Sequence, residues 1–246
     1  MATTGTTNFN PDVAEIMEEA FERAGTDMRN SNHVKSARRS LNLIALEWQN
    51  AGLNLWTVDE QSIPSSSIVA GTAEYDLGMD TIGIIEAAIR TDDGVSGSQS
   101  DLTVSKLSTT EYAQITDKLT QGRPVQYWFR RTGVDGGSST GADVTPKVRF
   151  YPIPDETDKY TFVYWRMRRI QDMDGSITNT VDVPSRFIPA LISCLALHLY
   201  EKLPPDQTNG LKARRLLDKK LEDWALATEE DREKVDFFIK PDLSAY

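Results

Sequence analysis

The chain has 246 residues, a mass of 27.5 kDa, 39 % hydrophobic and 26 % charged residues, and a formal net charge of −10 with a pI near 4.8. This size and composition are typical of a globular protein that needs no metal to fold, and no apolar run approaches the roughly 18 residues of a membrane span. The acidic charge argues against a protein that grips nucleic acid by its phosphates, because that requires clustered Lys and Arg side chains.

The first eight residues, Met1 to Asn8, have neither the basic start nor the apolar stretch of a signal peptide. The single cysteine, Cys194, excludes an internal disulfide framework. We therefore expect synthesis in the cytoplasm and no membrane partner.

A first helix is predicted over residues 11–24. Asn10 can cap the first free amides, Pro11 fits the first helical position, and Gly25 supplies a left-handed stop. Its apolar residues recur at helical spacing: Val13, Ile16, Met17, Ala20 and Phe21.

A second helix can begin with Asn32 as its cap and end before Gly52. Leu43 and Leu46 widen its apolar stripe, which implies contact on more than one side. The stripe itself consists of Val34, Ala37, Leu41, Ile44, Ala45 and Trp48.

Between residues 53 and 169 the pattern changes to β-branched and aromatic residues with frequent breaks. Seven strands are predicted, over 55–61, 73–77, 84–91, 102–105, 125–131, 147–151 and 159–168. The segment Ser108–Glu111 has the pattern of a capping box for a short helix through Ile115. Residues 92–101 and 132–146 are rich in Gly, Ser and Asp, which indicates long loops between strands.

Helical patterns return after Pro184. A largely apolar helix should be the most buried element, with Pro189 tolerable because it lies near the first turn. Pro204 and Pro205 end it, and a fourth long helix is predicted over about 208–234. One face of that helix carries Ala213, Leu217, Leu221, Trp224 and Thr228.

These elements predict an α+β fold: a four-helix bundle-like core with an inserted antiparallel β domain and an extended C-terminal arm. The expected domains are an N-terminal helical part, an inserted β-rich domain, a C-terminal helical part that packs with the first, and the arm. Their ranges are 1–52, 53–170, 171–233 and 234–246.

No catalytic, metal or cofactor site is predicted. His33 and His198 each lack a second ligand at metal-binding spacing. Gly136–Gly141 has the flexibility of a phosphate loop but not its lysine, and Asp172–Gly175 fits a β-turn better than a calcium loop. The acidic run Glu229–Asp231 is interpreted as a solvated helix end.

Two kinds of interaction site are predicted instead. Five arginines could pair with acidic residues of neighbouring subunits, an interpretation we favour over phosphate contacts; they are Arg130, Arg131, Arg166, Arg168 and Arg169. The last thirteen residues, from Lys234, are too apolar for an ordinary disordered tail. They either fold back onto their own domain or form a docking arm through Val235, Phe237, Phe238, Ile239, Pro241, Leu243 and Tyr246.

The order of these elements resembles the head-to-tail adaptor (connector) proteins of tailed bacteriophages, of the short-tailed type. The segments that carry the resemblance are Ala37–Leu43, Glu47-Trp48, Asn54–Val58, Gly71–Leu77, Val183–Leu191 and Glu229–Arg232. The resemblance implies a ring of typically twelve copies beneath the portal protein, with the helical parts forming the ring. It also implies that the β insertion faces outward or toward the tail and that the C-terminal arm reaches the portal.

The expected function is therefore structural, in the virion at the head-tail interface. The ring would extend the channel for double-stranded DNA, without binding it specifically, and offer a platform to a tail nozzle or tail tube protein. One alternative is a tail-side ring or tail-completion protein that binds no portal. An alternative of another class is a hydrolase that uses carboxylates of the β region.

Overall fold

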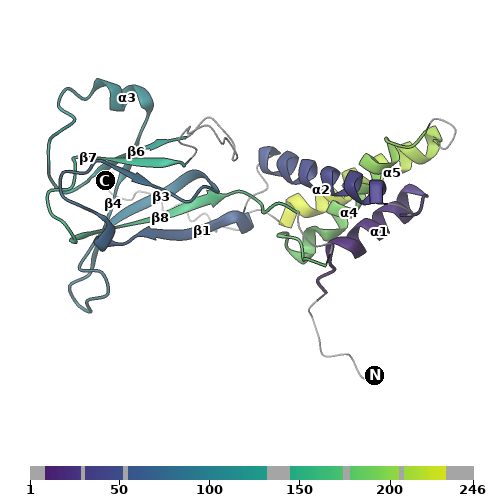
Figure 1. Cartoon of the computed structure of the whole chain (residues 1–246), viewed down its shortest axis with the longest axis horizontal. Helices are drawn as coiled ribbons and strands as arrows, with labels where there is room; N and C mark the ends of the chain where they lie inside the picture. Colours follow the sequence, from purple (N-terminus) through teal and green to yellow (C-terminus); the bar gives the residue numbers. More distant parts are fainter. Residues whose placement is uncertain are drawn as a thin grey trace, which may run out of the picture. The chain divides into compact units, whose positions relative to one another are not determined.

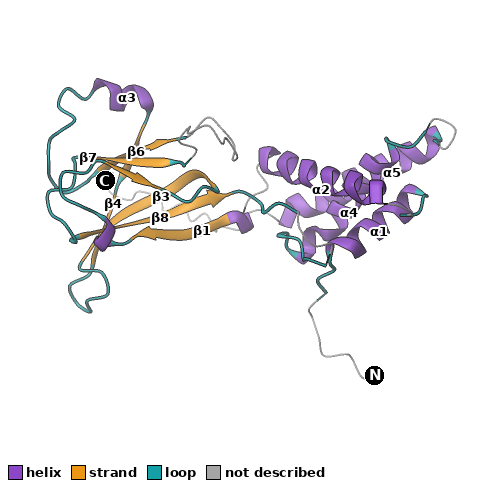
Figure 2. Ribbon diagram, in the orientation of Figure 1, coloured by secondary structure: helices purple, strands orange, loops and turns teal. Residues whose placement is uncertain are grey.

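The computed structural model describes residues 9–28, 31–51, 55–131, 145–173, 178–204 and 208–230. The chain divides into two compact units, the helical unit of residues 1–55 with 170–246 and the β unit of residues 56–169. The described residues form five α-helices and two four-stranded sheets. Figures 1 and 2 show the long helices in one unit and the strands in the other. The predicted α+β class is confirmed.

Helix α1 (Val13–Ala24) begins two residues later than predicted, and its N-cap is Asp12 and not Asn10. The Asp12 carboxylate accepts a hydrogen bond from the Glu15 amide at 2.8 Å, and the Glu15 carboxylate accepts one from the Asp12 amide at 3.1 Å. This reciprocal pair satisfies two amides at once, so it fixes the start of the helix. Gly25 ends α1 with φ +81°, as predicted.

Replacing Asp12 by alanine is expected to lower the free energy of unfolding by about 0.5–2 kcal/mol, because the Glu15 amide loses its acceptor. Asn10→Ala is the matched control and should stay within about 0.5 kcal/mol of the parent. Urea titrations followed by circular dichroism measure both. Equal losses in the two variants would show that the capping box does not hold this helix end.

Helix α2 (Ser31–Ala51) already includes Asn32, so that residue lies in the first turn and does not cap the helix. The predicted stop, Gly52, lies outside the described residues. Leu43 and Leu46 are 48 % and 42 % exposed, whereas the buried apolar positions are Ala37, Leu41, Ile44, Ala45 and Trp48.

Helix α4 (Ile188–Tyr200) follows a 3-10 turn over Ser185–Phe187, with Pro189 in its first turn. It contacts α1, α2 and α5, and nearly every side chain along it is buried. The prediction that this helix is the most buried one therefore holds. None of the described helices combines the length and apolar character needed to cross a membrane.

Helix α5 (Gly210–Glu230) packs with a face that matches the predicted one only in part, because Trp224 contacts Trp48 at 5.6 Å between ring centroids but two predicted leucines do not pack. Leu217 and Leu221 are 44 % and 56 % exposed, whereas Asp223 and Ala227 are buried. The Asp223 carboxylate accepts a hydrogen bond from Ser193 on α4. Counting apolar residues missed this face because a buried, hydrogen-bonded carboxylate lies at its centre.

The β unit contains two sheets. The first has the order β1-β8-β3-β4 and is antiparallel throughout. Its strands are Val58–Ile63, Tyr160–Arg168, Thr81–Thr91 and Ser100–Thr103. The second has the order β2-β7-β6-β5, with strands Glu74–Asp76, Lys147–Tyr151, Gln126–Arg130 and Ser105–Leu107.

The structure corrects several strand predictions. The segment 102–105 was expected to be one strand, but Val104 separates β4 from β5, which belong to different sheets. The loop expected at 92–101 is shorter because β4 begins at Ser100, and residues 55–57 form a 3-10 turn before β1. The β5–β6 pair is parallel, so the β unit is not purely antiparallel as predicted. Of the loop 132–146, residues 132–144 lie outside the described ones.

A short helix, α3 (Thr109–Gln114), connects β5 to the segment before β6. Its capping box is present as predicted: Ser108 and Glu111 each accept a hydrogen bond from the other's backbone amide. A helical crossover of this kind lets two neighbouring strands run parallel.

The core of the β unit is formed by buried side chains of both sheets. Phe162 of β8 lies 4.9 Å from the ring of Phe150 on β7 and 5.8 Å from that of Tyr127 on β6, measured between ring centroids. Three aromatic rings thus join the two sheets across the core. The other core residues include Ile63, Ile68, Tyr75, Leu77, Ile84, Ile89, Val104, Phe129, Val148, Tyr160 and Tyr164.

Candidate functional site

The five arginines predicted as interface residues lie in two places in the β unit. Arg166 and Arg168 are on β8, and Arg169 follows that strand directly. Arg130 ends β6 in the other sheet, and Arg131 follows it. The two groups therefore belong to different sheets and must be considered separately.

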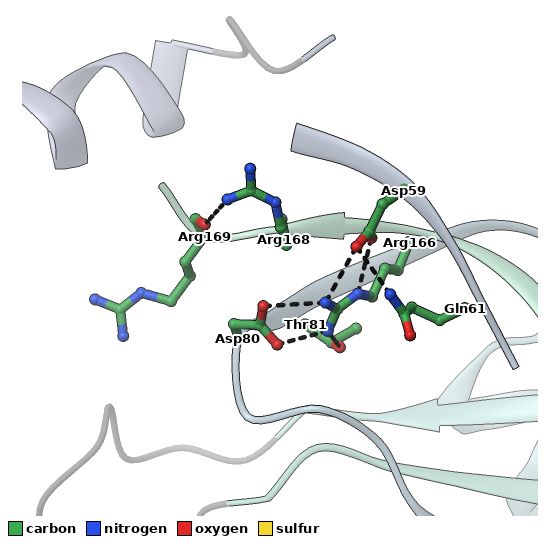
Figure 3. Close-up of polar contacts among 7 residues, drawn as sticks. All are labelled: Asp59, Gln61, Asp80, Thr81, Arg166, Arg168 and Arg169. Atoms are coloured by element: carbon green, nitrogen blue, oxygen red, sulfur yellow. Dashed lines mark hydrogen bonds and ion pairs between the residues drawn. The ribbon is translucent and has the colours of Figure 1, made fainter. Parts of the chain in front are cut away.

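Arg166 lies between two carboxylates of its own chain (Figure 3). Its Nε donates to Asp59 Oδ1 at 2.8 Å, and its Nη2 donates to Asp80 Oδ2 at 3.1 Å. Nη1 donates to the hydroxyl of Thr81 at 2.9 Å. The Arg166 side chain is only 9 % exposed, so these partners compensate a charge that has been largely removed from water.

Gly78 makes this close packing sterically feasible. A Cβ atom at this position would lie 2.5 Å from Nη1 of Arg166 and 2.8 Å from Oδ1 of Asp80. Both distances are shorter than a van der Waals contact, so a larger residue would displace the guanidinium. Sequence reasoning missed Gly78, Asp59 and Asp80, because nothing near them in the chain points to Arg166.

The ion pairs change the pKa of both kinds of partner. Partial burial by itself would raise the pKa of Asp59, but hydrogen bonds from Arg166 and Gln61 outweigh it and hold that pKa below its usual range. Burial likewise opposes the charged form of Arg166, but hydrogen bonds to Asp59 and Asp80 raise its pKa above the usual value. Asp59 and Arg166 therefore both remain charged at neutral pH.

Arg168 and Arg169 continue from this cluster at the end of β8. Nη1 of Arg168 donates to the carbonyl oxygen of Arg169 at 3.1 Å, and the amide of Arg169 donates to the carbonyl oxygen of Asp80 at 2.8 Å. Both arginine residues are half-buried. Asp80 thus makes two contacts: its backbone carbonyl binds the Arg169 amide, and its carboxylate binds the Arg166 guanidinium.

The second group is centred on Glu74 of β2. Its carboxylate pairs with Arg149, with Lys147 at 3.5 Å and with Arg130 at 3.8 Å. Partial burial alone would raise the pKa of Glu74, but the hydrogen bond from Arg149 and the nearby cations lower it. Arg130 is 46 % exposed, which keeps its guanidinium accessible to water.

Stability should fall in acid because the pKa values of Asp59 and Glu74 are depressed in the folded chain. A carboxyl group whose pKa is lower in the folded state stabilises the fold above its unfolded pKa, and this contribution disappears as the pH falls through the folded pKa. We expect the midpoint of urea unfolding to decrease below about pH 5. An Arg166→Met variant should show a flatter dependence between pH 7 and pH 3, and an unchanged slope would contradict this origin of the acid sensitivity.

In the described ranges, the side chains that most often perform catalysis form ion pairs or lie apart from one another. Among the described residues, no group of three or more His, Cys, Asp or Glu side chains could hold a metal ion. The Asp59 and Asp80 carboxylates bind Arg166, and His198 lies 3.8 Å from Glu47. Burial raises the pKa of the Cys194 thiol to about 11, so its nucleophilic thiolate is scarce at neutral pH.

A groove of about 560 Å³ between α1 and the start of α4, in the helical unit, is a feature that the sequence did not suggest. Its apolar lining comes from two segments far apart in the chain, so no local pattern could reveal it. The apolar lining residues are Phe9, Pro11, Ile16, Ile188, Pro189 and Ile192.

Some predicted features lie outside the described residues. These are the docking arm, including Val235 to Tyr246, the glycine-rich segment Gly136–Gly141, and Gly175 of the predicted β-turn.

Comparison with known proteins identifies one protein family that this chain matches. The model of the family described as "SU10 adaptor protein" matches residues 11–234. The match covers nearly the whole chain and includes every described helix and strand. Among curated proteins, no match is found.

Proposed function

Because the chain belongs to the SU10 adaptor protein family, whose members are structural adaptors of bacteriophages, we propose that it forms the head-to-tail ring below the portal protein. In this role the ring extends the DNA channel and offers the tail a platform for attachment. Assembly itself is the activity, and no substrate is turned over. The observation that carries the proposal is the family match over residues 11–234.

The proposal assigns a role to each part of the chain. Residues 1–52 and 171–233 act as one helical domain, a four-helix bundle that builds the ring, and residues 53–170 act as an inserted domain directed outward or toward the tail. The contacts of α4 with α1, α2 and α5 support a single helical body. Twelve copies is the number that the resemblance to short-tailed phage adaptors implies.

Residues 234–246 are proposed as the arm that docks on the portal. Their large apolar side chains could contribute roughly 1.5–3 kcal/mol each when buried. Ordering a chain segment costs about 1–2 kcal/mol per residue, so one arm of thirteen residues would bind weakly alone. Backbone pairing with the portal and the simultaneous docking of many arms make the attachment firm.

Charge has two roles in the proposed ring. The net charge of −10 per chain repels DNA, which allows the DNA to pass through the channel without sticking. Arg130, Arg131, Arg168 and Arg169 are proposed to contact acidic residues of neighbouring subunits. Arg166 forms its ion pairs inside its own subunit, so its part in such an interface is to hold the end of β8 in place.

The test compares three forms of the chain on portal-bearing heads: the full chain, a chain ending at Glu233, and a full-length variant in which Phe237, Phe238 and Ile239 are serines. The serine variant preserves the length of the arm and removes its apolar side chains. Bound copies per vertex are counted by electron microscopy and mass measurement.

A ring from the full chain alone would support both the adaptor role and its arm. A ring from all three forms would support the adaptor role and exclude the arm as the docking element. No ring from any of them would overturn the proposal in favour of a tail-side ring or tail-completion protein, which would then be sought on isolated tails.

A further inference from the structure

The groove between α1 and α4 has an apolar lining, and acidic side chains surround it. Glu15, Glu18, Glu19 and Glu22 of α1 line the groove between α1 and α4, together with a single cation, Arg23. Arg23 is already engaged, since its Nε donates to Glu19 at 2.8 Å and its Nη1 to Ser193 at 3.0 Å. The rim of the groove therefore carries a net negative charge.

Two of these carboxylates lack a cation partner within the described part of the chain. Glu18 and Glu22 are exposed, and no ion pair joins either of them to another described residue. Phe9 lines the same groove and is 75 % exposed. An exposed aromatic ring and unpaired charges around an apolar groove are typical of a surface that binds another protein.

The outer face of α2 has the opposite character. Lys35, Arg39, Leu43 and Leu46 follow one another at spacings of four, four and three residues, which places them on one stripe of the helix. All four are exposed, and the two leucines are 48 % and 42 % exposed. We name these four residues the α2 stripe.

The α2 stripe and the groove lie on different sides of the helical unit. Helix α2 contacts α4 through its buried face, around Leu41, Ile44 and Trp48, and the stripe points away from that face. Figure 1 draws α2 and α1 on opposite sides of α4. A subunit thus presents the α2 stripe, which is basic and apolar, on one side and an acidic, apolar groove on the other.

We propose that the α2 stripe of one copy binds in the α1–α4 groove of the next copy. This inference rests on the proposed ring and names the surfaces that close it. Lys35 and Arg39 face the unpaired Glu18 and Glu22 of the neighbour, while Leu43 and Leu46 cover the apolar floor. Because the two surfaces differ, each copy receives one neighbour and inserts into another, which is the heterologous contact that generates rings.

The charge and the apolar lining of the groove favour a second copy of the chain as its binding partner. A second copy supplies, on one rigid helix, cations that complement the acidic rim of the groove and leucines that can cover its apolar lining. A single contact of this size is weak in isolation. Copies held at one vertex by their arms are at high effective concentration, so the contacts form together.

The test uses two full-length variants with one reversed surface each. In the groove variant, Glu18→Lys and Glu22→Lys make the rim basic; in the stripe variant, Lys35→Glu and Arg39→Glu make the stripe acidic. Each variant alone sets like charges against each other, whereas a mixture restores opposite charges at every contact of an alternating ring. The matched control for the groove variant, Glu60→Lys with Glu86→Lys, makes the same charge change at exposed positions of the β unit.

Copies per portal vertex are counted for the parent chain, each variant, the equimolar mixture and the control. We expect each single-surface variant to give roughly tenfold fewer complete rings, and the mixture and the control to match the parent. Complete rings from either variant alone, or none from the mixture, would overturn the proposed interface while leaving the ring intact for the parent chain. If the parent itself forms no ring, the proposed function fails, and the interface fails with it.

Discussion

Replacing Phe162 by alanine is expected to lower the free energy of unfolding of the β unit by about 3–5 kcal/mol. The Phe162 side chain is fully buried, and its ring lies 5.2 Å from that of Tyr164 in addition to its contacts with Phe150 and Tyr127. Alanine would remove the ring that joins the two sheets and leave a cavity that its aromatic neighbours can fill only in part.

Urea unfolding followed by tryptophan fluorescence measures this loss. The control is Ile85→Ala, a truncation in the same sheet at a residue that is 51 % exposed, and it should change the free energy by no more than about 0.5 kcal/mol. A Phe162→Ala variant as stable as the control would mean that the sheets do not depend on this aromatic cluster.

The second large effect is expected for Arg166→Met, at about 2–3 kcal/mol. Methionine preserves much of the apolar stem but leaves Asp59 and Asp80 without their shared cation and repelling each other. These carboxylates are 33 % and 47 % exposed, so water compensates part of the loss and the effect stays below that of a fully buried pair.

Arg90→Met is the control for Arg166→Met. Arg90 also binds two carboxylates, Asp93 and Asp101, but its side chain is 23 % exposed and not 9 %. We expect this change to cost no more than about 1 kcal/mol. Adding Asp59→Asn and Asp80→Asn to Arg166→Met should recover part of the loss, because the remaining groups are then neutral. No recovery would show that the guanidinium stabilises the fold by packing and not by charge.

The helices were the most predictable part of the fold. Apolar residues at helical spacing located α1, α2, α4 and α5, and a capping box located α3. The errors concern which residue caps a helix and which face of a helix packs against the others. Asp12 displaced Asn10 as a cap because only Asp12 has Glu15 three residues later, and α5 turned its Asp223 face inward because Ser193 of α4 supplies a hydrogen bond.

Strand positions were predicted well, but their partners were not. Val104 is a buried β-branched residue, so the segment around it gives one continuous strand pattern. The division into β4 and β5, and the parallel pairing of β5 with β6, depend on how distant segments meet in space. Strand pairing of this kind leaves little trace in local composition.

Of the candidate site, the sequence indicated the arginines but not the carboxylates that they bind. Neighbouring positions suggested that Arg166, Arg168 and Arg169 act together, but Arg166 binds carboxylates 107 and 86 residues away in the chain. The acidic groove likewise combines residues of α1 and α4 that have no sequence proximity. A sequence identifies such groups individually, and only the fold brings them together.

The first and last strands of the β unit are neighbours, with Val58 of β1 opposite Met167 of β8. Paired strands lie about 5 Å apart, so the chain leaves this domain close to where it joined it. A domain whose two ends are adjacent can be inserted, removed or replaced without moving apart the two chain segments that flank it. The β unit can therefore vary or be replaced within the adaptor family, while the helical unit keeps its sequence under separate selection.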